Sequence, residues 1–287
     1  MSAAATLRSL IGKGEIVMAP GAPDPLAARL VQRAGFPAVY MTGFGATASR
    51  LGAPDLGLLT QTEMTEHARN MTRAVTIPVI ADADTGYGGP LNIHRAVREY
   101  LQAGVAAIHL EDQIAPKRCG QLAGIKLVPA EENVLRLRCA LEARGDDDLI
   151  VIGRTDALPA FGVEEAIRRA RLYRQAGVDL VFVDGVKTIA EVEAIARGVP
   201  GPKVVSIVGG NETVALKAAD LQAMGFQVVF YALSALFSAV KAMADTLDVL
   251  KQDGTPAGRA DAMVSYAEYA EIVDLAGCQR RSDRFGG

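Results

Sequence analysis

The sequence predicts one (β/α)8 barrel spanning residues 1–287, and two observations support that prediction. The chain has 287 residues, of which 50% are apolar, and this length and composition suit a single large core. The second observation is an internal repeat in which a helix end, a glycine and an apolar β-rich run follow one another. The repeat occurs at RAGFPAVYMT (33–42), QAGVAAIHLE (102–111), QAGVDLVFVD (175–184) and QAMGFQVVFY (222–231).

Each repeat predicts a helix that ends where a strand begins. The glycine stands where a residue just past a helix adopts the left-handed conformation at least cost. These glycines are Gly35, Gly104, Gly177 and Gly225. The runs that follow are almost continuously apolar, as in strands buried on both faces.

Four further apolar runs bring the number of expected strands to eight. They are EIVMAP (15–20), IPVIADAD (77–84), LIVIGRTD (149–156) and KVVSIV (203–208). Amphipathic helical segments lie between the strands, among them 91–103, 163–176 and 212–224. Alternating βα units at this number favour a barrel over two Rossmann halves, and no GxGxxG motif occurs at the first strand-to-helix turn.

A C-terminal helical extension of about 234–277 follows the eighth strand. Residues 234–254 and 261–277 each read as one helix. The second helix exceeds what the barrel needs, so it either packs on another subunit or covers its own barrel.

Composition excludes several classes of protein. The formal net charge of −3 and the absence of tryptophan give no reason to expect nucleic acid or an anionic membrane as a partner. No apolar run approaches the roughly 20 residues of a membrane span, and the N-terminus has no apolar signal segment. The cysteines Cys119, Cys139 and Cys278 are odd in number and form no CxxC, which indicates a reducing, cytoplasmic location without disulfides or a thiolate zinc site.

Polar residues end nearly every expected strand, and in a parallel barrel these ends meet at one mouth. The residues are Thr42, Asp82, Asp84, His109, Glu111, Arg154, Asp156, Asp184, Ser206 and Tyr231. A barrel built for stability alone does not need so many polar groups at one end. We therefore expect the active site there.

Carboxylates at this mouth predict a site for a hard cation. Asp82 and Asp84 in ADADTGYGG share a strand face, as do His109 and Glu111 in HLED. Carboxylates without a cluster of His or Cys suit Mg²⁺, and Asp55 can reach such an ion through water. The alternative is that one aspartate caps the helix near residue 91. His109 taken alone is more often hydrogen-bonded within a barrel than a ligand.

Cys119 in PKRCGQ lies on a loop over the mouth. Because Lys117 and Arg118 precede it, we expect a lowered thiol pKa and thiolate character. Spacing alone leaves a catalytic and a structural role equally open, and the two cations could be solvated loop charges. Asp112, beside Glu111, points away from the mouth and is expected to be structural.

Two further motifs suggest anion binding. Arg154 in GRTDA needs an anion, either a substrate carboxylate or an internal acid such as Asp156. The segment YMTGFG (40–45) offers backbone N–H groups as an anion nest, or is simply an ordinary tight turn.

Together these motifs resemble the isocitrate lyase/phosphoenolpyruvate mutase superfamily, in its methylisocitrate lyase and dimethylmalate lyase branch. YMTGFG, PDLG, DADTGYGG, HLEDQ, KRCG and GRTDA occur in that family's order and spacing, over about residues 7–277. The resemblance implies a barrel whose eighth helix is exchanged between subunits of a dimer or tetramer. It also implies Mg²⁺, with Mn²⁺ as the alternative, held directly by Asp82 and largely through water by Asp55, Asp84 and Glu111.

The resemblance further implies the roles of the remaining residues. Cys119 matches the general acid of the mobile loop, and Arg154 matches the arginine that pairs with a substrate carboxylate. Catalytic participation is also implied for Glu111 and His109. The substrate would contact residues that share the pocket: Tyr40, Thr42, Gly43, Phe44, Gly120, Gln121, Arg154, Asp184 and Ser206.

Several positions depart from the branch. Gln121 stands where the lyases carry histidine, Ile125 where lysine is common, and Asp184 where glutamate is usual. The seventh strand ends SIVGG (206–210), where relatives carry asparagine near Ser206 and glutamate near Gly209. Each change removes a polar partner for distal carboxylates, and the bulk of Phe44 makes the pocket smaller or more apolar.

The sequence thus predicts a Mg²⁺-dependent carbon–carbon lyase that cleaves a 2-hydroxy di- or tricarboxylic acid of the 2-alkylmalate or methylisocitrate type. One alternative keeps the superfamily but changes the bond, to oxaloacetate hydrolysis or decarboxylation or to C–P chemistry. The other alternative is a barrel that binds a dicarboxylate without turning it over.

Overall fold

The computed structural model describes residues 1–286 and contains a closed barrel of parallel strands, as predicted. Neighbouring strands pair in sequence order, and β8 returns to β1 with Val228 opposite Val17. The strands are β1 Val17–Ala22, β2 Val39–Met41, β3 Val79–Asp82, β4 Ala107–Leu110, β5 Ile150–Thr155, β6 Leu180–Val183, β7 Lys203–Ser206 and β8 Val228–Tyr231.

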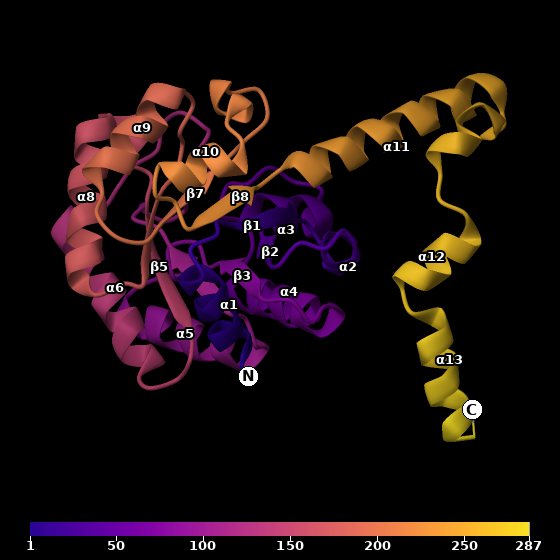
Figure 1. Cartoon of the computed structure of the whole chain (residues 1–287), viewed down its shortest axis with the longest axis horizontal. Helices are drawn as coiled ribbons and strands as arrows, with labels where there is room; N and C mark the ends of the chain where they lie inside the picture. Colours follow the sequence, from indigo (N-terminus) through magenta and orange to yellow (C-terminus); the bar gives the residue numbers. More distant parts are fainter. Residues whose placement is uncertain (287) are drawn as a thin grey trace.

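Helices surround the barrel and continue beyond it at the C-terminus (Figure 1). The α-helices are α1 Ala3–Gly12, α2 Pro25–Arg33, α3 Gly43–Leu51, α4 Gln61–Ala74, α5 Pro90–Ala103, α6 Ala130–Arg144, α7 Ala157–Phe161, α8 Val163–Ala176, α9 Ile189–Gly198, α10 Ala218–Ala223, α11 Ser234–Asp253, α12 Tyr266–Ile272 and α13 Leu275–Arg284. Two 3₁₀ helices, η1 Glu212–Ala215 and η2 Ala257–Ala262, accompany them. The glycines at 35, 104, 177 and 225 all have positive φ, which confirms the predicted helix ends.

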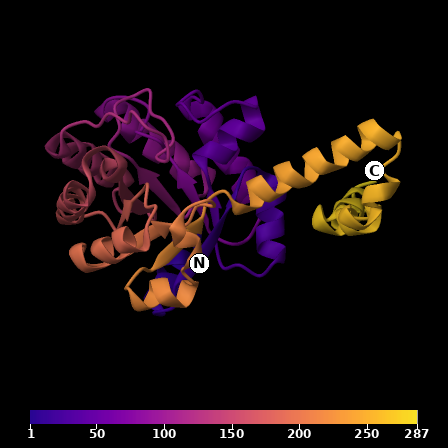
Figure 2. The same cartoon turned by 90° about the horizontal axis from the view of Figure 1, so that it is seen from above.

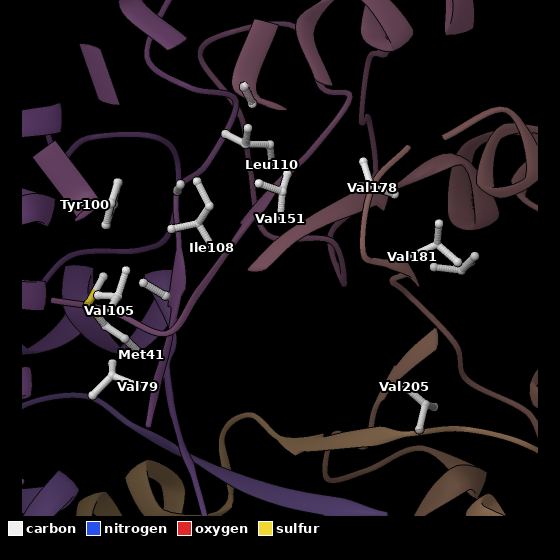
Figure 3. Packing of buried hydrophobic residues seen from close by; sticks show 14 of the residues in the cluster. Met41, Val79, Tyr100, Val105, Ile108, Leu110, Val151, Val178, Val181 and Val205 are labelled. Atoms are coloured by element: carbon white, nitrogen blue, oxygen red, sulfur yellow. The ribbon is translucent and has the colours of Figure 1, made fainter. Parts of the chain in front are cut away.

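The core has two layers, one between the strands and the helices and one inside the barrel. In the outer layer Ile108 of β4 and Val151 of β5 are in register and pack side by side (Figure 3). Inside the barrel Tyr40 stacks on Phe230 with ring centroids 4.1 Å apart. Leu7 of α1 packs against the same inner cluster, so α1 closes the end of the barrel opposite the polar mouth.

Several acids lie just past the strands rather than on them. β3 ends at Asp82, and Asp84 follows in the left-handed region with φ 47°. β4 ends at Leu110, one residue before Glu111. The expectation that Asp82 and Asp84 share a strand face is therefore wrong. The two residues lie close together because a turn follows the strand. α5 begins at Pro90 after Gly89, so neither aspartate caps it.

Two helices that were expected to be continuous are broken. Residues 212–224 form η1 and then α10, because the Asp220 carboxylate accepts the backbone N–H of Lys217 at 2.8 Å and starts a new helix. Residues 261–277 divide into α12 and α13. Ser265 and Glu268 form a capping box that starts α12, and Asp274, with φ 54°, caps α13.

The C-terminal arm, residues 234–286, leaves the barrel with α11 and returns beside α2 (Figures 1 and 2). Arg33 of α2 pairs with Glu271 of α12 at 3.0 Å. α11 itself buries no residue within the described chain. None of the helices in residues 1–286 has the length and apolarity that a bilayer crossing requires.

Candidate active site

A small cavity of about 40 Å³ lies at the polar mouth of the barrel and gathers most of the predicted site residues. Its predicted lining residues are Tyr40, Thr42, Phe44, Asp55, Asp82, Cys119, Gly120, Gln121, Arg154, Asp184 and Ser206. Phe182, Val208, Ala232 and Leu233, which the sequence did not single out, complete the wall. His109, Glu111, Asp84 and Gly43 lie outside this wall but are buried or packed against it.

Carboxylates outnumber cations beneath this cavity. Six buried acids surround it, namely Asp55, Asp82, Asp84, Glu111, Asp156 and Asp184. Lys117 and Arg154 are the cations that contact them. Because buried charges need partners, the excess of acids indicates a place for added positive charge.

Lys117 is the first of these cations. Its ammonium lies 2.8 Å from an oxygen of Asp55 and 2.8 Å from an oxygen of Asp84. The side chain is only 4% exposed, so the reading of Lys117 as a solvated loop charge is wrong. Burial opposes its charge, but the surrounding carboxylates, Asp84 foremost, raise its pKa well above the usual value.

Arg154, at the end of β5, pairs with internal acids. Its Nη2 lies 2.8 Å from Asp156 and 2.7 Å from Asp184, and its Nε lies 3.2 Å from Glu111. The sequence left open whether Arg154 pairs with a substrate carboxylate or with an internal acid, and the structure shows the pair with the internal acid Asp156. The fork of the guanidinium thereby joins the ends of β4, β5 and β6 into one ion-pair cluster.

Asp82 is fixed by backbone groups. The N–H of Gly43 donates to one carboxylate oxygen at 3.2 Å and the N–H of Asp84 to the other at 2.9 Å. A Cβ on Gly43 would stand 2.5 Å from the carboxylate, so this approach needs glycine. Burial tends to raise the pKa of Asp82, yet Lys117, Arg154 and His109, which is protonated only at the low pH where Asp82 titrates, hold this pKa below its usual range. The N–H of Gly43 in YMTGFG thus holds an internal carboxylate.

The donors fit a hydrated divalent cation. Within residues 1–286 no three His, Cys, Asp or Glu side chains converge as a ready set of direct ligands. Both oxygens of Glu111 and one oxygen of Asp84 are nevertheless buried without a well-aligned hydrogen bond, although Arg154 lies 3.2 Å from Glu111 and Lys117 lies 2.8 Å from Asp84. Burial raises the pKa of Asp84 to about 6 and that of Glu111 well above its usual value, as expected of acids short of positive charge. Mg²⁺ typically takes one or two carboxylates and several waters, which such acids suit.

His109 is held by hydrogen bonding. Its Nε2 lies 3.0 Å from the hydroxyl of Tyr40, and its Nδ1 lies 3.6 Å from Asp82. Burial lowers the pKa of His109 to about 4, so the imidazole is neutral at physiological pH. The other two histidines, at 67 and 94, lie on α4 and α5 and do not line the cavity.

Cys119 is placed over the mouth, but in a different protonation state from the one expected. Burial raises the pKa of its thiol to about 11, so the expectation of a lowered pKa and thiolate character is wrong. Arg118 does not compensate, because its guanidinium is exposed and donates to the carbonyl of Ala123 at 3.0 Å. The site therefore contains a protonated thiol, which suits an acid rather than a nucleophile.

Gly120 packs directly on the ion-pair cluster. A Cβ at this position would stand 2.5 Å from Asp184, 2.7 Å from Asp156 and 3.0 Å from Arg154. The loop is thus closed onto the charges below it, and only glycine permits this approach.

The far side of the cavity is mostly apolar, and its polar groups are the amide of Gln121, which lies beside that of Asn211, and the hydroxyl of Ser206. Phe44, Val208 and Leu233 line it together with Ser206. The Asn211 amide, a contact that no local pattern indicated, donates to Gln121 at 3.3 Å. Ile125 is buried but does not line the cavity.

Comparisons with known proteins identify one family. The sequence profile of the phosphoenolpyruvate phosphomutase family matches residues 7–251. A 2,3-dimethylmalate lyase from Eubacterium barkeri is 42% identical over 96% of this chain and 95% of its own, and a 2-methylisocitrate lyase from Aeropyrum pernix is 36% identical over 96% and 88%.

Two solved structures are similar over nearly the full length. One is oxaloacetate acetylhydrolase with the inhibitor 3,3-difluorooxalacetate, with a TM-score of 0.94, 35% identity and coverage of 100% of this chain and 98% of that one. The other is phosphonopyruvate hydrolase with oxalate and Mg²⁺, with a TM-score of 0.89, 32% identity and coverage of 99% of each chain.

Proposed function

The chain belongs to the phosphoenolpyruvate mutase/isocitrate lyase superfamily and is an enzyme of its carbon–carbon lyase class. From that premise we propose that it is a Mg²⁺-dependent lyase, which cleaves a 2-hydroxy di- or tricarboxylic acid of the 2-alkylmalate or methylisocitrate type to a 2-oxo acid. The observation that carries the proposal is the placement of the Cys119 thiol, whose pKa burial raises, in one small cavity with Arg154 and the carboxylates.

Mg²⁺ would be held directly by Asp82 and through water by Asp55, Asp84 and Glu111. When bound, it supplies positive charge that stabilises the developing 2-oxo group. Lys117 neutralises Asp55 and Asp84 from the loop side. Arg154 binds the substrate carboxylate, exchanging one of its internal acids for the ligand.

The proton balance follows from the groups present. The substrate hydroxyl gives its proton to one of the carboxylates around Arg154, and its oxygen becomes the carbonyl of the 2-oxo acid. The C2–C3 bond breaks, and its electron pair passes to the leaving fragment as an enolate. The Cys119 thiol then donates its proton to the carbon end of that enolate.

Substrate entry requires the loop over the site to move. A cavity of about 40 Å³ holds a few water molecules and no dicarboxylic acid. The closed loop, with Gly120 against Asp184 and Asp156, excludes water during the reaction.

The far wall supports a substrate with an alkyl arm. Phe44, Val208 and Leu233 offer apolar contact, while Gln121 and Ser206 are neutral hydrogen-bonding groups. The cations Arg154 and Lys117 are already engaged by acids, so a third carboxylate would lack a cationic partner. We therefore favour 2-alkylmalates over tricarboxylates.

We also propose that the enzyme is a homodimer or homotetramer in which α11 packs on a partner subunit. The arm exposes Phe237, Val240, Met243 and Leu247, each at least 46% accessible. An apolar cavity of about 770 Å³ lies between α2 and α11, lined by residues such as Leu26, Leu30 and Leu236. An apolar surface of this kind on a single chain favours coverage by a second copy.

A product screen tests the reaction class. The enzyme is incubated with Mg²⁺ and, separately, 2-methylmalate, 2-ethylmalate, 2,3-dimethylmalate, methylisocitrate, oxaloacetate and phosphonopyruvate, and products are identified by NMR. We expect 2-oxo acid from at least one alkylmalate. Oxalate and acetate from oxaloacetate alone would instead establish the hydrolase alternative, which the similarity to oxaloacetate acetylhydrolase supports. Binding without any product would establish a non-catalytic barrel.

A further inference from the structure

Gln113 is buried next to the site without lining its cavity. It follows Glu111 and Asp112 at the exit of β4, and only 1% of its surface is exposed. An amide so deeply buried must satisfy its donors and acceptor within the protein. Its partners lie on two different parts of the active site.

The first partner is the loop that carries Cys119. The Gln113 carbonyl oxygen accepts the backbone N–H of Arg118 at 3.0 Å, and its Nε2 donates to the backbone carbonyl of Arg118 at 2.8 Å. One side chain therefore holds both polar backbone groups of the residue that precedes Cys119. The next backbone group, the N–H of Cys119, donates to the carbonyl of Asp55 at 3.0 Å.

The second partner is the acid that orients Arg154. The remaining N–H of Gln113 lies 3.2 Å from a carboxylate oxygen of Asp156. The Asp156 carboxylate in turn accepts a hydrogen bond from the Arg154 guanidinium at 2.8 Å. The backbone N–H of Asp156 is fixed as well, because it donates to Asp112 at 3.0 Å. Consecutive residues 112 and 113 thus hold Asp156 by its backbone and by its side chain.

We propose that Gln113 is a positioning residue that couples closure of the Cys119 loop to the orientation of Arg154 through Asp156. When the loop closes, the backbone N–H and carbonyl of Arg118 form hydrogen bonds with the Gln113 side-chain amide. The other N–H of the same amide then donates to Asp156. Opening the loop leaves the amide partly unsatisfied, so closure and the alignment of Arg154 stabilise each other. The turnover consequence rests on the proposed lyase function, whereas the loop consequence does not.

Two variants test the coupling, and a matched variant controls for loss of an amide. Gln113→Met keeps the side-chain volume and removes all three hydrogen bonds, while Gln113→Glu loses both N–H donors. The control is Gln32→Met, because Gln32 also accepts a backbone N–H, that of Thr76, far from the site. Loop opening is read as the rate of iodoacetamide modification of Cys119, resolved by peptide mass mapping, with exposed Cys278 as the internal reference.

In both Gln113 variants we expect iodoacetamide to modify Cys119 about tenfold faster than in the wild type. The reason is that each lost hydrogen bond lowers the equilibrium constant for loop closure by a factor of a few. With an alkylmalate that the wild type cleaves, kcat should fall about 10- to 100-fold while KM changes by less than about threefold, because Gln113 does not face the substrate. Gln32→Met should leave the Cys119 rate and kcat unchanged, even if it lowers the melting temperature.

An unchanged Cys119 rate in folded Gln113 variants would overturn the proposal, as would loss of the native fold in both variants. A loss of stability alone, with kcat retained, would also overturn it, because this indicates a merely structural role. If the wild type cleaves no substrate but the Gln113 variants still expose Cys119, the proposed function fails and the loop anchor stands.

Discussion

The backbone N–H of Cys119 donates a hydrogen bond to the carbonyl oxygen of Asp55 at 3.0 Å. This bond ties the loop that carries the thiol to the loop that carries Asp55, a carboxylate that we propose binds the cation through water. Lys117, two residues before Cys119, repeats the link through the Asp55 side chain. Cation binding and placement of the thiol are therefore expected to depend on each other.

Replacing the thiol tests its role as the acid. Cys119→Ser should lower cleavage of an alkylmalate by about 10²- to 10⁴-fold, because a hydroxyl is a much weaker acid than a thiol. The fold should be retained, and decarboxylation of oxaloacetate should be largely unaffected. Steady-state assays of 2-oxo acid release provide the measurement, with Cys278→Ser on α13 as the control. Equal cleavage by Cys119→Ser and wild type would rule out the assigned role.

The pKa of Cys119 predicts how its reactivity depends on pH. Burial raises this pKa to about 11, so the reactive thiolate is scarce at neutral pH and its fraction grows about tenfold per unit as pH rises toward 11. The rate of Cys119 modification by iodoacetamide, measured from pH 7 to pH 10, should increase without levelling off. A plateau at or below pH 9 would show that the thiol is not buried as described.

Gly120 is predicted to tolerate no side chain. In Gly120→Ala the added Cβ would overlap Asp184, Asp156 and the guanidinium of Arg154, so the loop cannot close on the cluster. We expect kcat to fall by about 10²-fold with little change in the melting temperature. Gly209→Ala is the matched control, because a Cβ there has no atom within 4 Å and should leave kcat unchanged. Comparable kcat for the two variants would contradict the tight approach.

The proposed cation site predicts that Mg²⁺ raises the stability of the fold. Saturating Mg²⁺ should raise the melting temperature of the wild type by several degrees, since binding at 100 times Kd adds about 2.7 kcal/mol. In Asp82→Asn this increase should be largely lost, whereas exposed Asp146→Asn should keep it. Thermal unfolding with and without Mg²⁺ measures both. An equal increase in the two variants would place the cation elsewhere.

The exposed face of α11 predicts association. Val240→Asp combined with Leu247→Asp introduces charge on an apolar surface that a partner is proposed to cover, so the assembly should dissociate. Light scattering coupled to size-exclusion chromatography measures the mass. Leu91→Asp on α5, at a position that is 87% exposed, serves as the control. A wild-type monomer, or an unchanged mass in the double variant, would oppose the proposal.

The barrel was predictable because its signals are local. The glycines at the helix ends, the apolar strand runs and the polar residues at their ends each follow from a few neighbouring residues. The break at Ser265 also had a local signal, the capping box with Glu268, which the continuous apolar pattern obscured.

The electrostatics of the site were not predictable in the same way. Lys117 pairs with Asp55, which lies 62 positions earlier, and no local pattern reports such a partner. The basic neighbours of Cys119 suggested a lowered pKa, but burial outweighs them and Arg118 turns outward. The contacts of Gln113 and Asn211 likewise appear only once the loop is folded over the barrel.

Cleavage of an alkylmalate in D₂O with Mg²⁺ tests the central claim most directly. Mass spectrometry should find one 2-oxo acid for each substrate consumed, and one deuterium on the carbon of the other product that Cys119 protonates. Cys119→Ser should form these products at least about 10²-fold more slowly. Absence of 2-oxo acid from every alkylmalate, or equal rates for the wild type and Cys119→Ser, would contradict a lyase that uses the Cys119 thiol as its acid.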